Sequence, residues 1–529
     1  MAHRWAPTTN QDRGRPEMAE GTKLARRLSI QDASFLYNET ANGPLHIGLL
    51  QTFEGEIAPE RLTEHFARRI HLLPRFRQRA VFAPFNLAHA TLEDDPDFAP
   101  GNHIRHHVLP RRFSDAEMTE AAMLINETML DRNRPLWELH LFGDLEGGRS
   151  ALLWKIHHSI VDGVSALQVI SAAMDLRADA PAPASEELPW SPQKLPGTSK
   201  SLLDAAAALV RSRLDEMSAA GRLLSSPADL AERSAAMADA ARQMLQMMSR
   251  PIVSAPWNAG LVSHSRSLAY LGVSFGDLRA IRGSLGGTVN DVVLTILSEG
   301  AARYLKHHKV ASHGLPLRIG CPVSVRRESE SAAMGNRVSM MFPELGAAPM
   351  DPIERYQSVV RETERIKAAR EPQGMDLLVA TADAVPPSLQ ELNSRMAATG
   401  LDAAARLSEL SGGIARITAG APTGINFVAT NVPGPQVPLY LAGRRMRDFV
   451  GLVPLAGTLG YGVAIVSYNQ RLFFGLMAEP RMMPDVEFMK SCIADSFEEL
   501  KAAALEAAPM EDRLARAAEA VMKRDSAVA

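Results

Sequence analysis

Two adjacent histidines, His157 and His158, are the residues of this sequence best suited to chemistry. An imidazole titrates near neutrality, so a histidine can take a proton from a hydroxyl or a thiol and return it later. Asp162 and Gly163 close the same stretch. Asp162 could fix a histidine tautomer or hold the loop, and Gly163 permits a close approach that a Cβ would forbid. The stretch predicts a general base, with a satisfied structural histidine as the alternative.

A metal site is another interpretation of paired histidines. Adjacent residues of a strand point to opposite faces, and a zinc site needs further ligands. The stretch contains no other histidine and no cysteine, so we expect no metal there. Cys321 and Cys492 lie far apart and form no metal or redox motif, which fits a reducing compartment.

A buried strand and a helix must position the two histidines. Residues 151–156 are almost entirely apolar, as in a strand that is covered on both faces. A helix is expected from 164 to about 174, so the histidines lie where a strand ends and a loop begins. Residues 134–142 form the preceding strand, joined to the first through Gly147 and Gly148 in a hairpin.

Strands and helices alternate on both sides of a segment rich in Pro and Ala, which indicates an α/β protein with two related subdomains. We expect a disordered tail at 1–27, an N-terminal subdomain at 28–180, a linker at 181–263, a C-terminal subdomain at 264–505 and a tail at 506–529. Two amphipathic linker segments fit either lipid-surface helices or a helical connection. Their acidic residues favour the connection.

Hydrophobic periodicity and capping residues give the expected positions of the other elements. Helices are expected at 59–72, 115–129, 275–284, 289–307, 354–370 and 484–503. Strands are expected at 41–53, 103–108, 266–273, 317–323, 424–431, 450–454, 462–469 and 471–477.

The charge balance argues against a nucleic-acid-binding protein, although it leaves room for a local basic patch. The chain has 57 basic and 60 acidic residues and a net charge of −3, whereas nucleic-acid-binding proteins usually carry a basic excess. No run of about 18 apolar residues occurs, so a spanning helix is not expected. The first residues are polar and lack the apolar core of a secretory signal.

Ser274 raises a competing hypothesis, because residues 272–276 match the GxSxG elbow of serine hydrolases between a strand and a helix. Ser274 and Asp277 also form a capping pair, which explains the serine without chemistry. The only histidines that follow it are His307, His308 and His313, at a predicted helix end and loop. The capping role is therefore favoured.

The stretch 157–163 is a full match to HHxxxDG, the motif of acyltransferases with the chloramphenicol-acetyltransferase fold and of peptide-synthetase condensation domains. More closely, the chain resembles the bacterial wax ester synthase/diacylglycerol acyltransferase family. The segments that carry this resemblance, in the family's order, are 28–36, 44–48, 134–137, 290–294, 322–326 and 430–435.

The resemblance implies two chloramphenicol-acetyltransferase-like subdomains of mixed sheets and helices, with the active-site channel between them. It implies an O-acyltransferase that moves a fatty acyl group from acyl-CoA to a diacylglycerol or a long-chain alcohol, without a further cofactor. In this scheme His158 is the general base, His157 and Asp162 hold the loop, and Gly163 leaves room for the thioester.

Further roles follow from the resemblance alone. Thr430 or Asn431 would stabilise the oxyanion. Asn290 and Asp291 would support the channel, with helix capping as the simpler role. Ser324 and Arg326 would meet the phosphates of coenzyme A or tie the halves together.

The expected location is cytoplasmic, with peripheral contact at the inner membrane or lipid inclusions. A lipid-binding protein without activity and a condensation domain that takes acyl chains from carrier proteins are the alternatives. The intact motif and the lack of an attached carrier-like segment count against them.

Overall fold

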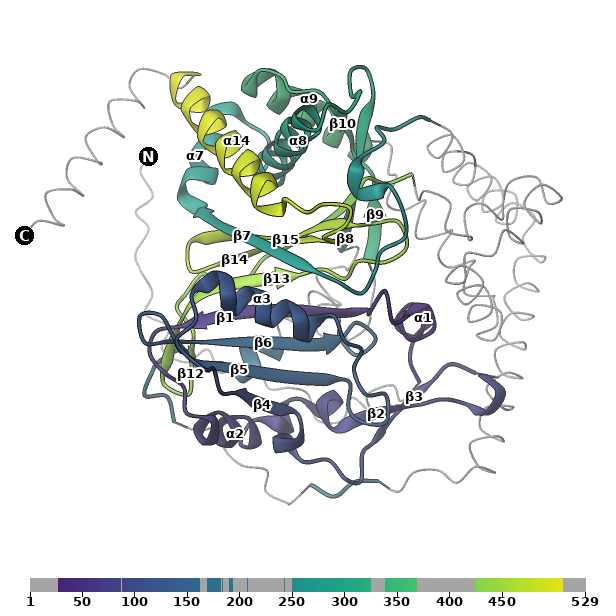
Figure 1. Cartoon of the computed structure of the whole chain (residues 1–529), viewed down its shortest axis with the longest axis vertical. Helices are drawn as coiled ribbons and strands as arrows, with labels where there is room; N and C mark the ends of the chain where they lie inside the picture. Colours follow the sequence, from purple (N-terminus) through teal and green to yellow (C-terminus); the bar gives the residue numbers. More distant parts are fainter. Residues whose placement is uncertain are drawn as a thin grey trace, which may run out of the picture.

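The computed structural model of the chain describes residues 27–161 except 87, 169–181, 183, 190–193, 207, 242, 250–324, 338–368 and 424–507. The predicted tails before 27 and after 507 and the two amphipathic linker segments lie outside these ranges. Two sheets form the framework, one above the other in Figure 1, and helices pack around them.

The N-terminal sheet carries the histidine pair. Its order is β12-β13-β1-β6-β5-β4. These strands are β1 (His46–Phe53), β4 (Ile104–His107), β5 (Trp137–Leu145), β6 (Arg149–His157), β12 (Tyr440–Leu441) and β13 (Arg444–Leu452). Its helices are α1 (Ile30–Asn38), α2 (Pro59–Ala67) and α3 (Asp115–Asn126), and a small ribbon pairs β2 (Gln78–Val81) with β3 (Thr91–Asp94). The predicted β5–β6 hairpin is confirmed.

The second sheet belongs to the C-terminal half, in the order β10-β8-β11-β14-β15-β7, with β9 paired to β8. Its strands are β7 (Ser267–Ser274), β8 (Pro316–Ser324), β9 (Val338–Met341), β10 (Glu344–Gly346), β11 (Phe427–Val432), β14 (Tyr461–Tyr468) and β15 (Arg471–Ala478). Its helices α7 (Phe275–Leu285), α8 (Val289–His307), α9 (Pro352–Ala368) and α14 (Val486–Ala507) gather on the side away from the N-terminal sheet (Figure 1).

One strand crosses from the second half into the first. Chain order assigned β13 to the C-terminal subdomain, whereas it pairs antiparallel with β1, from Gly48 opposite Leu452 to Phe53 opposite Met446. The Thr52 hydroxyl donates to Asp448 across this pair at 2.6 Å. The local pattern of 444–452 shows that it is a strand, but pairing with a partner some 400 residues earlier has no local signal.

Side-chain caps set the helix starts that the sequence predicted. Ser114 and Glu117 form the expected capping box of α3, and Thr288 and Asp291 form one at α8, whose bounds agree with the prediction. The helix expected over 59–72 ends at Ala67 and continues as short 3-10 turns.

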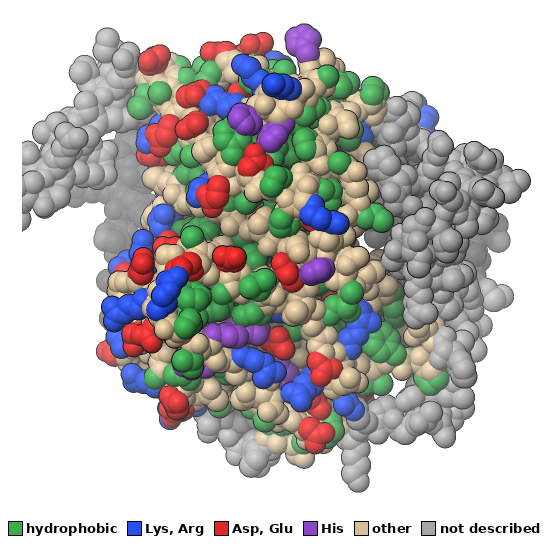
Figure 2. All heavy atoms as spheres, viewed as in Figure 1, with side chains coloured by type: hydrophobic (Ala, Val, Ile, Leu, Met, Phe, Trp, Pro, Cys, Tyr) green, Lys and Arg blue, Asp and Glu red, His purple; other side chains and the backbone are tan. Residues whose placement is uncertain are grey.

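The visible surface carries both signs of charge. Figure 2 shows Lys and Arg side chains interspersed with Asp and Glu over both halves of this face, without a large patch of one sign. Among the helices of the described ranges, none combines the length and the apolar character needed to cross a bilayer.

Candidate active site

Both histidines are fixed by their backbone at the end of β6. The His157 amide donates to the Leu136 carbonyl at 2.9 Å, and the His158 amide donates to the Leu45 carbonyl at 3.0 Å. These acceptors precede β5 and β1, the two neighbours of β6 in the sheet. The predicted placement of the pair at a strand end is therefore confirmed, and both sides of the strand hold it.

His157 is a buried residue that supports the loop. Its side chain is fully buried, and its Nδ1 receives hydrogen bonds from the Ser159 amide at 3.1 Å and the Ser159 hydroxyl at 2.7 Å. Because an amide N–H can only donate, Nδ1 is an acceptor and the proton of the neutral ring lies on Nε2. Nε2 faces the Glu39 carboxylate, with Oε1 at 3.5 Å.

Glu39 is a buried carboxylate that follows α1. Its Oε1 accepts from the Leu45 amide and its Oε2 from Arg132, both at 3.0 Å. Burial alone would raise the pKa of Glu39, but the contact and charge of His157, the Leu45 amide and Arg132 outweigh it and lower that pKa to about 2. Glu39 is therefore a fixed negative charge behind the histidine pair.

Two more ionisable groups with shifted pKa values surround the strand end. His46, opposite His157 in the sheet, donates from Nε2 to the Asn126 carbonyl at 2.8 Å. Burial, aided by Lys155, lowers the pKa of His46 to about 3. Lys155 donates to the Ile125 carbonyl and the Thr128 hydroxyl, and burial lowers its pKa to about 8. Clusters of such groups are typical of functional sites.

His158 is the half-buried member of the pair. Its ring stacks on the ring of Phe35 from α1, with centroids 3.9 Å apart and planes 10° apart. In Figure 1, α1 lies beside the ends of β1 and β6, next to the second sheet. Of the two histidines, His157 is fully buried and His158 retains some exposed surface.

The structure brings together two of the other predicted site residues. The Asn431 side chain, at the end of β11, donates to Asn290 Oδ1 at 3.3 Å, and Asn290 lies in the first turn of α8. Thr430 is half-buried beside it. Asp162, Gly163 and Arg326 lie outside the described residues, as does the side chain of Ser324, which ends β8.

Asp291 has the simpler of its two predicted roles. Its side chain is 2% exposed, so it is closed to substrate. Its Oδ2 accepts from the Thr288 hydroxyl at 2.7 Å, and its Oδ1 accepts from the Thr363 hydroxyl at 2.8 Å. Asp291 therefore caps α8 and ties it to α9, as the simpler of the two predicted roles requires.

Ser274 has the capping role that the sequence favoured over the hydrolase hypothesis. The Ser274 hydroxyl accepts from the Asp277 amide at 3.2 Å and caps α7, as the capping pattern predicted. His308 lies 2.8 Å from Asp485, and the ring of His307 lies 4.3 Å from that of Phe488. The structure assigns both histidines to contacts between α8 and the start of α14.

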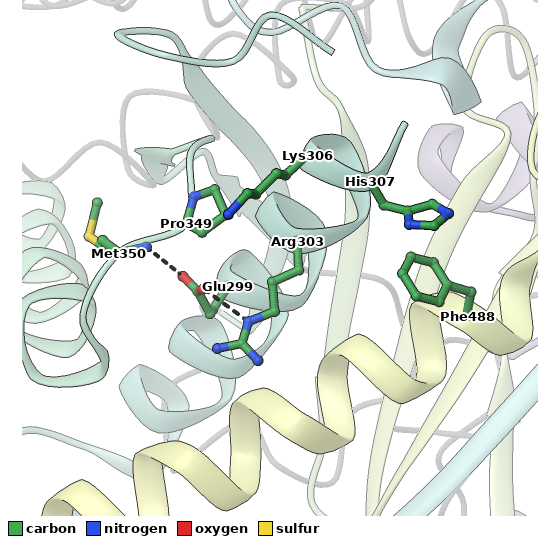
Figure 3. Close-up of a pocket in the computed structure, with 7 residues that line it drawn as sticks. All are labelled: Glu299, Arg303, Lys306, His307, Pro349, Met350 and Phe488. Atoms are coloured by element: carbon green, nitrogen blue, oxygen red, sulfur yellow. Dashed lines mark hydrogen bonds and ion pairs between the residues drawn. The ribbon is translucent and has the colours of Figure 1, made fainter. Parts of the chain in front are cut away.

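Two cavities of the described residues lie away from the histidine pair. A pocket of about 660 Å³ opens between α8, α14 and the loop before α9 (Figure 3). There Arg303 binds Glu299, and Glu299 also accepts from the Met350 amide, so these groups satisfy one another. A cleft of about 860 Å³ separates α3 of the first half from β7 and α14 of the second. Neither histidine lines it.

Sequence reasoning missed Phe35, Glu39 and Arg132. The segment 28–36 contributed only to the family resemblance, and no helix was predicted there. A signal was present, because Ser29 and Asp32 have capping-box spacing, and the Ser29 hydroxyl does accept from the Asp32 amide at 3.1 Å. Nothing in the local pattern marks Glu39 as buried. Within the described ranges, no three His, Cys, Asp or Glu side chains are arranged to hold a metal ion.

Two stacked mixed sheets with a strand-end HHxxxDG histidine define an acyltransferase of the chloramphenicol-acetyltransferase fold class. The chain belongs to the wax ester synthase/diacylglycerol acyltransferase family: the model of the family's catalytic domain matches residues 28–293 and that of its C-terminal domain matches 334–501. The resemblance and the fold class inferred from the sequence are thereby confirmed.

Relatives and solved structures agree with this assignment. A Mycobacterium tuberculosis protein named as a diacylglycerol O-acyltransferase is 29% identical over 499 residues, covering 91% of each chain. The solved wax ester synthase/diacylglycerol acyltransferase from Marinobacter aquaeolei has a TM-score of 0.59 at 22% identity, covering 90% of this chain and 99% of that one. A trichothecene 15-O-acetyltransferase from Fusarium sporotrichioides has a TM-score of 0.54 at 12% identity, covering 90% and 94%.

Proposed function

We propose that this acyltransferase moves a fatty acyl group from acyl-CoA to the hydroxyl of a diacylglycerol or a long-chain alcohol, with His158 as general base. The products are a triacylglycerol or a wax ester. The observation that carries the base assignment is the unequal burial of the pair. His157 is fully buried with both ring nitrogens directed at protein groups, whereas His158 is half-buried at the strand end.

The proposed reaction is a direct transfer without an acyl-enzyme. His158 takes the proton of the acceptor hydroxyl while the hydroxyl oxygen attacks the thioester carbonyl. The tetrahedral intermediate then collapses, the C–S bond breaks, and the imidazolium returns the proton to the departing thiolate. The ester and free coenzyme A leave, and His158 is neutral again. A positioned base of this kind contributes about a hundred- to ten-thousand-fold in rate.

Asn431 is the proposed donor to the oxyanion. Its amide is exposed, and Asn290 accepts one of its protons at 3.3 Å, which directs the amide group and leaves its second N–H free to donate to substrate. Thr430 is the alternative donor. Losing one such donor typically lowers kcat by about a hundred- to a thousandfold.

The remaining expectations stay proposals. Asp162 would hold the loop after the histidines and Gly163 would admit the thioester. Ser324 and Arg326 would contact the coenzyme A phosphates. The reaction would need no metal and no cofactor besides the acyl-CoA co-substrate. The protein would act in the cytoplasm and reach its lipid acceptor by peripheral contact with the inner membrane or with lipid inclusions.

Thiol release from palmitoyl-CoA tests the proposal, with hexadecanol, dioleoylglycerol or no acceptor, for the wild type and His158→Ala. We expect acceptor-dependent release with matching ester, and a loss of about a hundred- to ten-thousand-fold in the variant at an unchanged melting temperature. Full transfer by folded His158→Ala would contradict the base assignment. Release without acceptor would indicate a thioesterase, and no release would favour a lipid-binding protein or a carrier-bound donor.

A further inference from the structure

Helix α1 places an aromatic ring flat against the imidazole of the proposed base. We infer that Phe35 is a positioning residue of the acyl transfer: its ring fixes the plane of the His158 imidazole and stabilises the imidazolium that forms when His158 takes the acceptor's proton. This inference rests on the proposed role of His158 as general base, and its test is built to separate the two.

The geometry of the pair supports both effects. The ring centroids lie 3.9 Å apart and the planes differ by 10°, so the face of Phe35 covers one face of the imidazole. A cation within about 6 Å of an aromatic face is attracted by the ring quadrupole, whereas the neutral ring gains only the weaker stacking term. The contact therefore strengthens as the proton arrives, which is the property that accelerates a step rather than only binding its reactant.

Phe35 is held in place from both ends of α1. The Ser29 cap fixes the first turn, and the Glu39 amide closes the last turn on the Phe35 carbonyl at 3.2 Å. Arg132 binds the Leu36 carbonyl at 2.8 Å as well as the Glu39 carboxylate. The helix thus carries the ring for His158 and the carboxylate for His157 on one rigid element, so a small shift of α1 would move both supports together.

The half-buried state of Phe35 argues against packing as its sole role. The neighbouring Ala33 and Leu36 are buried in the core at 0% and 1% exposure, whereas Phe35 retains exposed surface while facing His158. A residue needed only for the core would face the same side as Leu36. Leucine at this position keeps much of the apolar cover and removes the π face, so it isolates the proposed effect.

The test compares Phe35→Leu and Phe35→Tyr with a matched control, Phe275→Leu. Phe275 is also half-buried and stacks with a cation, Arg279, at 4.6 Å, but it lies on α7 of the other half. We expect Phe35→Leu to lower kcat about 3- to 30-fold, the size of a cation–π contact, with the KM for palmitoyl-CoA within about twofold. Phe35→Tyr should restore most of kcat, and Phe275→Leu should match the wild type.

The pH profile separates this role from a packing role. His158 must be neutral to act as a base, and losing the ring that stabilises its protonated form makes protonation harder. The acid limb of kcat/KM in Phe35→Leu should therefore move to lower pH, while its plateau falls. An unchanged acid limb and plateau, or equal losses in the Leu and Tyr variants, would overturn the inference.

A double variant distinguishes failure of this inference from failure of the proposed function. If Phe35 acts through His158, adding Phe35→Leu to His158→Ala should cause no further loss of residual transfer. Independent losses in the double variant would overturn the positioning role and leave the base assignment standing. Full transfer by His158→Ala would overturn the base assignment and this inference with it.

Discussion

The two halves of the molecule use buried ion pairs for different ends. In the N-terminal half, Glu39 and His157 meet behind a strand end, beside the half-buried His158. In the C-terminal half, Glu299 is sandwiched between Arg355 of α9 and Arg303 of its own helix. Each network contains a buried carboxylate, but the first lies beside the proposed general base, whereas the second links helices beside a pocket of the C-terminal half. Burial of charge alone therefore does not distinguish the candidate site.

The C-terminal network joins helices. Arg355 is fully buried and donates to Glu299 Oε2 from two nitrogens at 3.0 and 2.9 Å. Arg303 extends the network to Glu499 of α14. The three helices α8, α9 and α14 are therefore linked through one carboxylate, and every partner in this chain of contacts is a structural residue.

Breaking the C-terminal network should have the largest effect on stability and little effect on chemistry. Arg355→Met leaves Glu299 with one charged partner in a buried site, so the free energy of unfolding should fall by about 3–5 kcal/mol. Urea unfolding measures it, and kcat per folded molecule should remain within about twofold. Arg365→Met, which removes a half-exposed ion pair with Glu362, is the control and should cost less than about 1 kcal/mol. If Arg355→Met lost kcat at unchanged stability, the C-terminal network would also serve the chemistry and would not differ from the N-terminal one.

Glu39→Gln should lower both the free energy of unfolding and kcat. It replaces a carboxylate that accepts two hydrogen bonds and faces His157, which costs about 1.5–3 kcal/mol, and it loosens His157 and α1, which should lower kcat by on the order of tenfold to a hundredfold. Glu117→Gln, at a half-buried capping carboxylate of α3 in the same half, should leave kcat unchanged. Equal kcat values for both variants and the wild type would show that Glu39 only stabilises the fold.

The pH dependence of stability follows from the same carboxylate. The folded-state pKa of Glu39 is lowered from 4.5 to about 2, so its stabilising contribution is fully present above pH 4.5 and is lost as the pH falls towards 2. In Glu39→Gln this loss between pH 4.5 and 2 should be absent, so the two stability curves converge at acid pH. If the stability curves of the wild type and Glu39→Gln, measured by thermal melts, ran parallel between pH 4.5 and 2, the lowered pKa of Glu39 would be contradicted.

Ser274→Ala should have the smallest effect. Removing the cap of α7 should cost about 1 kcal/mol and leave kcat unchanged. A folded variant without activity would restore the hydrolase hypothesis and move the site to the C-terminal half.

Local pattern was sufficient for most of the elements. The capping residues and apolar spacing predicted α3 and α8, and the apolar run before the histidines predicted β6. Helix α1 was missed because it has only nine residues and no clear apolar stripe. Only the end of β13 was predicted, as a strand over 450–454. Its sheet was not predicted, because register across distant segments is set by packing rather than by local sequence.

The candidate site also has features that the sequence predicted and features that it did not. The motif and its strand-end position followed from the sequence, and so did the suspicion that Asp291 is a cap. Different roles for His157 and His158 came from the family resemblance alone. The residue pattern gave no physical basis for them, because the contacts of each ring depend on α1 and the residue that follows it. Phe35 lies in α1 and Glu39 caps its end four residues later, yet they contact different histidines.

The strand shared between the halves has a consequence for biosynthesis. The Thr52 and Asp448 side chains that meet in the β1–β13 pair are 396 positions apart. At about 5–20 residues per second, a ribosome needs on the order of 20 to 80 seconds to make the second partner after the first. Throughout that interval β1 is an open edge, the kind of surface that invites aggregation. This edge of β1 therefore stays unpaired until the last sixth of the polypeptide emerges, and a chain truncated before β13 would leave it open permanently.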